Sequence, residues 1–295
     1  MRHPIDPKID CVFKALLGAR RNRRLLIHFL NAILGADLPA PLVRVDIIDP
    51  NNERESIDDK LSVVDVKARD AQGRLYQIEI QLLNHPDLPA RILYGWADLY
   101  SSQLQRGERY ARLRPTYSIW LLGQTLRSGV TECVHRFRLR DEQGRGLLDH
   151  GGIWLLELSK FATEVVETEQ DRWLKFFTEG ERLDDEHLPV WMHTEEMRQA
   201  MSTLKAFSEK QRAYYAYQAR QNYLRVQHSY QDHMDALREE AEQARAEVDQ
   251  ARTEADQVRA EADRAHAEAE QARAAEAQAN AEIERLKRLL EDKAD

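Results

Sequence analysis

The sequence predicts an α/β domain, followed by a helical cover and a C-terminal coiled-coil helix. Over residues 1–125, helix-like and strand-like patterns of apolar residues alternate. Residues 126–233 continue with two strand-like runs and then with helical segments rich in aromatic residues. Residues 234–295 contain no glycine and no proline and repeat every seven residues, as a coiled coil requires.

The composition is that of a globular chain with a core. Of its 295 residues, 42% are apolar, and no run of 18 apolar residues predicts a membrane span. The first ten residues, MRHPIDPKID, lack the apolar stretch of a secretory signal. Cys11 and Cys133 are the only cysteines, which argues against a disulfide framework and favours a reducing cytoplasm.

The net charge of −8 comes from the C-terminal segment. Residues 234–295 hold 10 of the 43 Lys and Arg residues and 18 of the 51 Asp and Glu residues, which leaves 33 of each kind in residues 1–233. The acidic balance of the whole chain therefore says little about what the body binds.

The elements of the first 125 residues follow from periodicity and turn residues. Apolar residues at helical spacing predict a helix over 21–35 that ends at Gly35. Strand-like runs at 61–69 and 74–83 are joined by the turn cluster DAQG. A helix within 89–107 then precedes an apolar strand at 116–123, an arrangement that predicts a sheet covered by helices.

The segment 126–233 adds strands at 135–141 and 153–159 and then aromatic helices. The aromatic residues sit at helical spacing, which favours a helical cover; a stacking platform for single-stranded nucleic acid is the alternative. They are Trp173, Phe176, Phe177, Tyr214, Tyr215, Tyr217 and Tyr223.

The seven-residue repeat predicts a long helix and, less directly, its association with a second copy. Position a holds Ala241, Val248, Ala255, Ala262, Ala269, Ile283 and Leu290, whereas positions g and e hold mostly Glu and Arg. Opposite charges at g and e can pair across two helices. Alanine buries little area, however, so a solvated single helix is the alternative to a homodimer through residues 234–295.

Two carboxylates are predicted to face each other across the strands at 61–69 and 74–83. If Ala71, Gln72 and Gly73 form the connection, paired residue numbers sum to 144, which sets Asp65 opposite Glu79. Like charges at directly opposed positions are destabilising. Alternatively, this edge of the sheet faces solvent and the two acids are unrelated.

A hard divalent cation would explain two opposed carboxylates. Mg²⁺ binds carboxylate oxygens, backbone carbonyls and water. Asp65 and Glu79 would then be the carboxylate ligands and the carbonyl of Ile80 the backbone ligand, with Gln81 pointing at the water that the metal activates. A shift of one residue in the pairing would destroy this geometry.

An Asp on one strand followed by Glu-x-Gln on the next is similar to the PD-(D/E)XK nuclease signature. The ordered segments DCVFKALLG, LLIHFLNAILG, KLSVVDVKARDAQGRLYQIEIQ, RILYGWADLYSSQLQRGERYARLRPTYSIWLL and LLELSKF resemble the Rpn family of recombination-promoting nucleases and putative transposases. This resemblance covers about residues 1–165 and continues weakly to 233. It implies a restriction-endonuclease-like core, a mixed central sheet flanked by helices.

The resemblance also implies metal-dependent cleavage of DNA with Mg²⁺ or Mn²⁺. Asp65 and Glu79 would be metal ligands, and Gln81 would occupy the position of the catalytic lysine. Gln cannot act as a base or carry positive charge, so it would orient water. Asp10 would be an additional acid near the metal; a first-turn helix acid is the alternative.

Several arginines and one tyrosine are candidates for contact with DNA. Arg91 and Tyr94, one helical turn apart after the Glu-x-Gln strand, would clamp and hydrogen-bond a phosphate, or else form an ordinary surface pair. The run ARRNRR at 19–24 offers a phosphate-contacting patch, or else a solvated helix start. Its arginines are Arg20, Arg21, Arg23 and Arg24.

The sequence thus predicts a nuclease-like domain at 1–165, a helical subdomain at 166–233 and a coiled coil at 234–295. The predicted function is metal-dependent DNA endonuclease activity, which the resemblance links to recombination or transposition. A DNA-binding or scaffold protein that no longer cuts is the second hypothesis. A coiled-coil adaptor is a third, but it leaves the carboxylate pair unexplained.

Overall fold

The computed structural model describes residues 3–48 and 65–291, and at residues 65 and 284–291 it describes only the backbone. The chain divides into two compact units, 1–226 and 227–295. Helix α6, Gln211–Glu291, begins in the first unit and continues through the second. Domain boundaries at 165/166 and 233/234 stay predictions, and the second of them falls inside α6.

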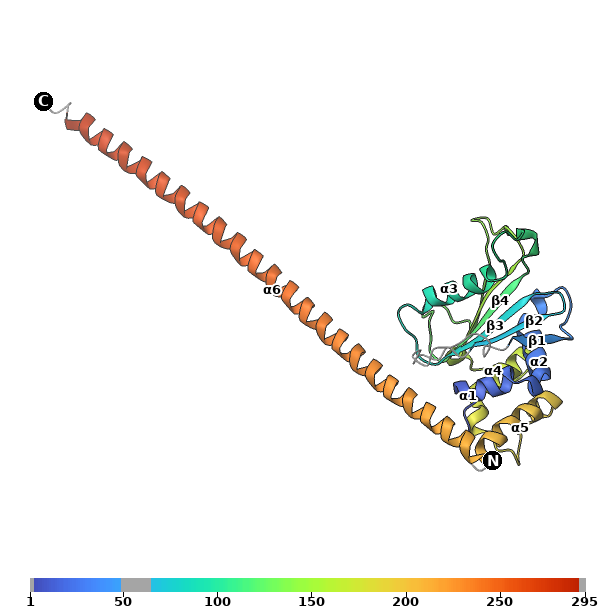
Figure 1. Cartoon of the computed structure of the whole chain (residues 1–295). Helices are drawn as coiled ribbons and strands as arrows, with labels where there is room; N and C mark the ends of the chain where they lie inside the picture. The colour runs from blue at the N-terminus through green and yellow to red at the C-terminus, as the bar shows by residue number, and fades with distance from the viewer. Residues whose placement is uncertain (1–2, 49–64, 292–295) are drawn as a thin grey trace. The chain divides into compact units, whose positions relative to one another are not determined.

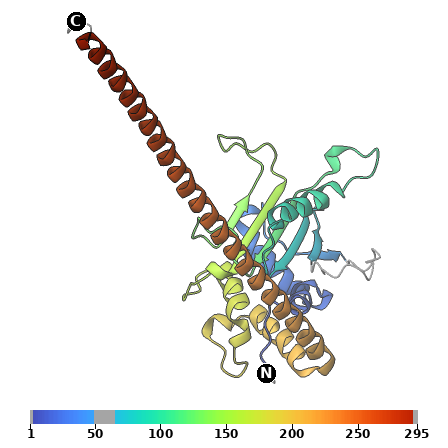
Figure 2. The same ribbon diagram turned by 90° about the vertical axis from the view of Figure 1, so that its left-hand side faces the viewer.

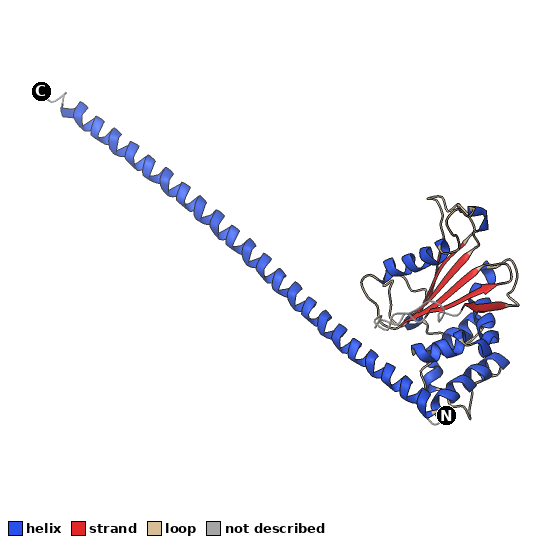
Figure 3. Ribbon diagram, in the orientation of Figure 1, coloured by secondary structure: helices blue, strands red, loops and turns tan. Residues whose placement is uncertain are grey.

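The strands that the structure describes form one mixed sheet, drawn in red in Figure 3. Its order is β1-β2-β3-β4-β6-β5, with parallel pairing at β3–β4 and β4–β6 and antiparallel pairing elsewhere. Helix α3, Leu88–Ser101, connects β3 to β4, because parallel neighbours need a crossover connection. The strands are β1 Val45–Ile48, β2 Asp65–Asp70, β3 Leu75–Gln81, β4 Thr116–Leu122, β5 Val134–Phe137 and β6 Gly151–Glu157.

Helices cover both faces of this sheet. Helix α3 packs on one face, and the remaining helices of the first unit pack on the other (Figure 1; Figure 2). The α-helices of the body are α1 Asp10–Phe13, α2 Arg23–Leu34, α3 Leu88–Ser101, α4 Glu169–Glu179 and α5 Glu195–Glu209. Short 3-10 segments lie at Arg20–Asn22, Gly35–Asp37, Tyr110–Arg112, Leu158–Lys160, Gly180–Arg182 and Val190–Met192, and a π-helical turn at Lys14–Gly18.

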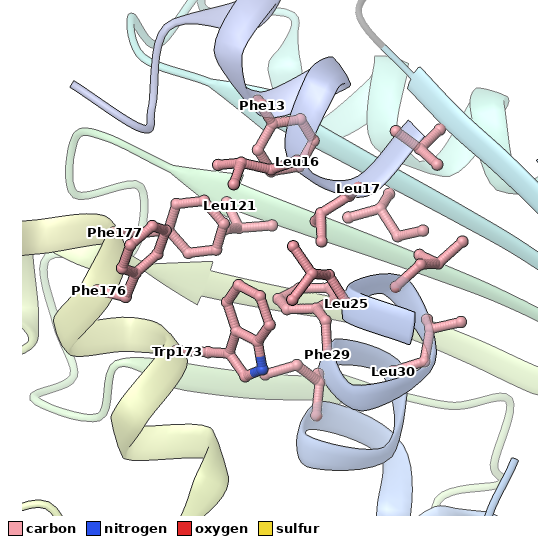
Figure 4. Packing of buried hydrophobic residues seen from close by; sticks show 14 of the residues in the cluster. Phe13, Leu16, Leu17, Leu25, Phe29, Leu30, Leu121, Trp173, Phe176 and Phe177 are labelled. Atoms are coloured by element: carbon pink, nitrogen blue, oxygen red, sulfur yellow. The ribbon is translucent and has the colours of Figure 1, made fainter. Parts of the chain in front are cut away.

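The larger core lies between the sheet and α1, α2, α4 and α5. Figure 4 shows Phe13, Phe29, Trp173 and Phe177 meeting there. The Phe29 and Trp173 rings form an edge-to-face pair at 5.4 Å between centroids, and both side chains are fully buried. The aromatics of α4 are therefore core residues, as the helical-cover interpretation expects, and are not available to stack on bases.

The start of α6 continues this cover. The Tyr217 hydroxyl accepts a hydrogen bond from the Asp6 N–H at 3.1 Å, and burial raises the pKa of Tyr217 to about 12. The Tyr214 ring stacks on His3 with 4.2 Å between centroids. Tyr215, by contrast, is exposed. Two of the tyrosines thus hold the N-terminal segment against the body.

The second face carries a smaller apolar cluster and the polar residues of β3. Helix α3 places Leu88 and Ile92 against Trp120 and Leu155. Gly95 of α3 lies so close that a Cβ built on it would be 3.7 Å from Nε2 of Gln77. Glu79 and Gln77 are consequently 3% and 4% exposed. The Glu-x-Gln strand is therefore covered on both faces, and the Glu79 carboxylate is buried.

The second unit is a continuous helix in the region that the structure describes. Val248, Val258 and Ile283 of the heptad pattern are between 50% and 66% exposed. A long helix is therefore present as the repeat predicts, whereas its pairing with a second copy is untested. None of the described helices is long and apolar enough to cross a membrane.

Candidate active site

The turn between β2 and β3 sets the register of the strand residues in the candidate site. Oδ1 of Asp70 accepts hydrogen bonds from the N–H groups of Gln72 and Arg74, each at 2.9 Å. Its Oδ2 accepts from Nε of Arg74 at 2.5 Å and from the Tyr76 hydroxyl at 2.8 Å. Gly73 adopts φ +81°, which favours glycine. The buried Asp70–Arg74 pair therefore fixes a three-residue connection.

This connection gives the register that the sequence predicts. Asp65 is directly opposed to Glu79, and Lys67 is opposed to Gln77. Directly opposed residues on an antiparallel pair share one face of the sheet, so these four positions belong to the face that α3 covers. The side chain of Asp65 lies outside the described residues, and the backbone pairing gives only its position in the register.

The Glu79 carboxylate is buried beside polar side chains on the face that α3 covers. Oε1 of Glu79 accepts a hydrogen bond from Nε2 of Gln77, and Oε2 lies 3.5 Å from Nη2 of Arg91. The side-chain oxygen of Gln77, Oε1, is buried and has no hydrogen-bond partner. A buried carbonyl oxygen without a donor is costly, so this oxygen is available to a ligand that can accept its lone pair.

Gln81 and Arg91 form a second contact within the site. Nη1 of Arg91 donates to Oε1 of Gln81 at 3.2 Å, and Nε2 of Gln81 donates to the Leu83 carbonyl at 2.7 Å. Both ends of the Gln81 amide are thus engaged. The guanidinium of Arg91 also lies 5.5 Å from the centre of the Trp120 ring, within the range of a cation–π interaction.

The oxygen donors present suit a hard divalent cation. The Gln81 carbonyl accepts from the Gly123 N–H on the β4 side, at 2.8 Å. Successive carbonyls of a strand alternate in direction, so the carbonyl of Ile80 points toward the β2 side, where Asp65 begins the described part of that strand. Two carboxylates, one backbone carbonyl and the unpartnered oxygen of Gln77 are ligand types that Mg²⁺ or Mn²⁺ accepts.

The structure contains no cluster of three His, Cys, Asp or Glu side chains that could hold a metal among the residues it describes. The site as predicted has two carboxylates, and Asp65 lies outside that comparison. Mg²⁺ commonly keeps several waters and is bound through one or two protein carboxylates, so two are sufficient.

Asp10 has partners of its own. Its Oδ2 pairs with Nε of Arg220 at 2.5 Å, and its Oδ1 accepts from the Cys11 N–H at 2.6 Å. Asp10 is the first residue of α1. These contacts favour the first-turn alternative, and a role near the metal stays a prediction.

The predicted DNA-contacting residues fall into two groups on opposite sides of the sheet. Arg91 and Tyr94 lie on α3, where Tyr94 is 73% exposed and Arg91 reaches into the site. The arginine run lies at the start of α2, on the other face. There Arg24 pairs with Glu195 at 2.8 Å and Arg23 lies 3.7 Å from Asp46. Arg20 and Arg21 are exposed.

Sequence reasoning placed Gln77 on the face of Glu79 but missed Lys67 as a neighbour of the site. The sequence contained the necessary information. The pairing rule that opposes Asp65 to Glu79 also opposes Lys67 to Gln77, two residues along each strand. It missed the contact of Trp120 with Arg91 for a different reason. That contact joins β4 to α3, and no local pattern encodes it.

Comparison with known proteins identifies the family of the chain but does not bear on the individual site residues. Searches of curated proteins and of solved structures found no match. A family model described as PD-(D/E)XK nuclease family transposase matches residues 7–234, most of the chain. The mixed six-stranded sheet flanked by helices fits the restriction-endonuclease-like α/β fold expected for that family. From the matched span and this fold, the chain belongs to the PD-(D/E)XK nuclease family transposases.

Proposed function

We propose that this protein is a metal-dependent DNA endonuclease that uses Mg²⁺ or Mn²⁺ and that serves recombination or transposition. The observation that carries the proposal is the register that opposes Asp65 to Glu79 on the face beneath α3. Membership of a nuclease family supports a nuclease-like or transposase-related role with DNA as the partner. The two free cysteines are compatible with the predicted cytoplasmic location.

In this proposal, Asp65, Glu79 and the carbonyl of Ile80 hold the metal at the edge of β3. A bound divalent cation would polarise a phosphoryl oxygen and lower the pKa of a bound water. The reaction is hydrolysis of a phosphodiester. The oxygen of water forms a bond to phosphorus and the bond from phosphorus to one ester oxygen breaks. The water gives up a proton to solvent, and the released alkoxide takes one.

The C-terminal helix would bring two such sites together. Cutting both strands of DNA with one metal centre per chain is most simply done by two chains, and a symmetric dimer is the commonest assembly. The exposed heptad residues of α6, Val248 and Val258 among them, support a homodimer through residues 234–295. The alanine-rich seam buries little area, so this association would be weak and concentration-dependent.

Cleavage of supercoiled plasmid tests the proposal. Wild-type protein with Mg²⁺ or Mn²⁺ is expected to nick and then linearise the plasmid, and Asp65→Ala is expected to lose that activity. Asp87→Ala removes an acid that is 86% exposed in its side chain and serves as the matched control. Cleavage that Asp65→Ala retains would place the chemistry elsewhere.

A DNA-binding scaffold that does not cut is the second candidate. The observation that favours it is the Gln81 amide, which has both ends engaged and can neither accept a proton nor carry charge. Plasmid binding without cleavage at any Mg²⁺ or Mn²⁺ concentration would select this candidate.

A further inference from the structure

The site lacks a positive charge on β3. Residue 81 is a glutamine, so this strand supplies no cation two residues after Glu79. Phosphodiester hydrolysis passes through a transition state with more negative charge on the phosphoryl oxygens, and a cation placed beside it is worth a large part of the rate. Either the metal acts alone or another element supplies the charge.

Arg91 of α3 brings a guanidinium to this position. Its Nη1 lies 3.2 Å from Oε1 of Gln81, so its charge is within hydrogen-bond distance of the end of the side chain at position 81. Its Nη2 lies 3.5 Å from Oε2 of Glu79. The same guanidinium thus contacts both Glu79 and Gln81, the two polar residues of the Glu-x-Gln motif.

Contacts with Gln81, Glu79 and Trp120 hold Arg91 in place while leaving it accessible. Gln81 is anchored through Nε2 to the Leu83 carbonyl, so its oxygen is turned toward Arg91. The Trp120 ring lies against the guanidinium at 5.5 Å. The side chain of Arg91 nevertheless remains 40% exposed, whereas that of Glu79 is 5% exposed. A phosphate arriving from solvent can therefore meet Arg91 beside the carboxylates.

We propose that Arg91 is the catalytic cation of this site and that Gln81 is the residue that positions it. Arg91 supplies from α3 the charge that a lysine at position 81 would supply from β3. This assignment rests on the proposed function. It differs from a phosphate clamp, because a clamp strengthens DNA binding equally before and during the reaction, whereas a catalytic cation acts on the transition state.

Relocating the charge tests the assignment. Arg91→Gln is expected to lower kcat about 100-fold, the effect of removing one charge-stabilising group. Its affinity for an oligonucleotide, measured with Ca²⁺ in place of Mg²⁺, should change far less. The double variant Arg91→Gln with Gln81→Lys, which restores a cation on β3, should recover most of the lost kcat. Arg198→Gln, an exposed arginine of α5, is the control.

A second measurement does not depend on cleavage. Because Arg91 lies beside Glu79, its charge opposes a cation there, so Arg91→Gln should bind Mn²⁺ more tightly than wild type. The double variant should return toward the wild-type affinity. Equal Mn²⁺ affinity in wild type and Arg91→Gln would contradict the placement of the charge.

The outcomes separate this assignment from the proposed function. If wild type does not cleave, the proposed function fails. If wild type cleaves and Asp65→Ala does not, but Arg91→Gln keeps kcat and loses DNA affinity, Arg91 is a clamp and the assignment is overturned. It is also overturned if Lys67→Gln, and not Arg91→Gln, removes kcat, because Lys67 shares the face of Glu79.

Discussion

Asp65 is directly opposed to Glu79 across β2 and β3, so two acidic residues hold opposed positions on one face of the sheet, where the side chain of Glu79 is buried. Without a cation between them, like charges at opposed positions destabilise the pair by up to about 1 kcal/mol. This repulsion would lower the stability of the metal-free protein, and a bound cation would relieve it.

The first prediction concerns this repulsion. Asp65→Asn should melt at or above the wild-type temperature in the absence of metal, by up to a few °C, because one charge is removed. Added Mg²⁺ should raise the melting temperature of wild type by mass action and leave the variant unchanged. Differential scanning calorimetry with and without EDTA measures both. A wild-type melting temperature that does not respond to Mg²⁺ would count against the site.

The second prediction concerns the turn that fixes the register. The sequence DAQGR at 70–74 recurs as DEQGR at 141–145, with the same Asp-to-Arg contacts and a glycine at positive φ in each. The Asp70 side chain is 1% exposed and that of Asp141 is 39% exposed. Asp70→Asn should therefore cost about 3 kcal/mol, because it leaves buried Arg74 without its carboxylate.

Asp141→Asn is the matched control, because it removes the same Asp-to-Arg hydrogen bonds at a turn that is exposed to solvent. Its cost in urea unfolding should be clearly smaller than that of Asp70→Asn, because solvent screens an exposed pair. Equal costs for the two variants would show that burial of the Asp70–Arg74 pair is not what stabilises the β2–β3 turn.

The third prediction concerns a buried carboxylate at the end of β6. Burial alone would raise the pKa of Glu157, but hydrogen bonds from Lys160, His135 and the N–H groups of Arg127 and Leu126 outweigh it and lower the pKa to about 2. A lowered pKa in the folded state stabilises the protein above the unfolded value and loses that effect as pH falls.

Wild type should therefore lose on the order of 3 kcal/mol of unfolding free energy from this group between about pH 4.5 and pH 2. Glu157→Gln should be destabilised at pH 7 by a similar amount. Its unfolding free energy should then fall less steeply than that of wild type as the pH is lowered. Urea unfolding at a series of pH values measures both curves. Parallel curves for the two proteins would contradict the assignment.

The fourth prediction concerns the C-terminal helix. Removal of residues 234–295 should leave a folded body that still binds metal, because the core lies within the first unit. Its cleavage of both strands should fall more than its nicking if two chains act together. Sedimentation at tens of micromolar protein should show association for the full chain and a monomer for the truncation. If the full chain and the truncation are both monomers, α6 is a single acidic helix that does not associate.

The part of the site that could be predicted is the part built from local interactions. The register of β2 and β3 follows from a turn whose own residues hydrogen-bond one another and from the alternation of side chains along a strand. Gly35 likewise ends α2, although its φ of −51° does not require glycine.

The remainder depends on tertiary packing. Arg91 meets Gln81 only because α3 docks against Gln77 and Trp120, and Arg220 meets Asp10 across 210 positions of the chain. Periodicity shows that a helix has an apolar face and does not show which polar residue its edge will contact. The burial of Glu79 followed from this docking and could not be deduced from its strand.

The most direct test of the account is a Mn²⁺ titration followed by electron paramagnetic resonance, because free Mn²⁺ has a signal that binding removes. Wild type should bind Mn²⁺, Asp65→Ala and Glu79→Gln should each lose that binding, and Asp87→Asn should keep it. Binding that survives both substitutions, or that is absent from wild type, would contradict a metal centre between Asp65 and Glu79.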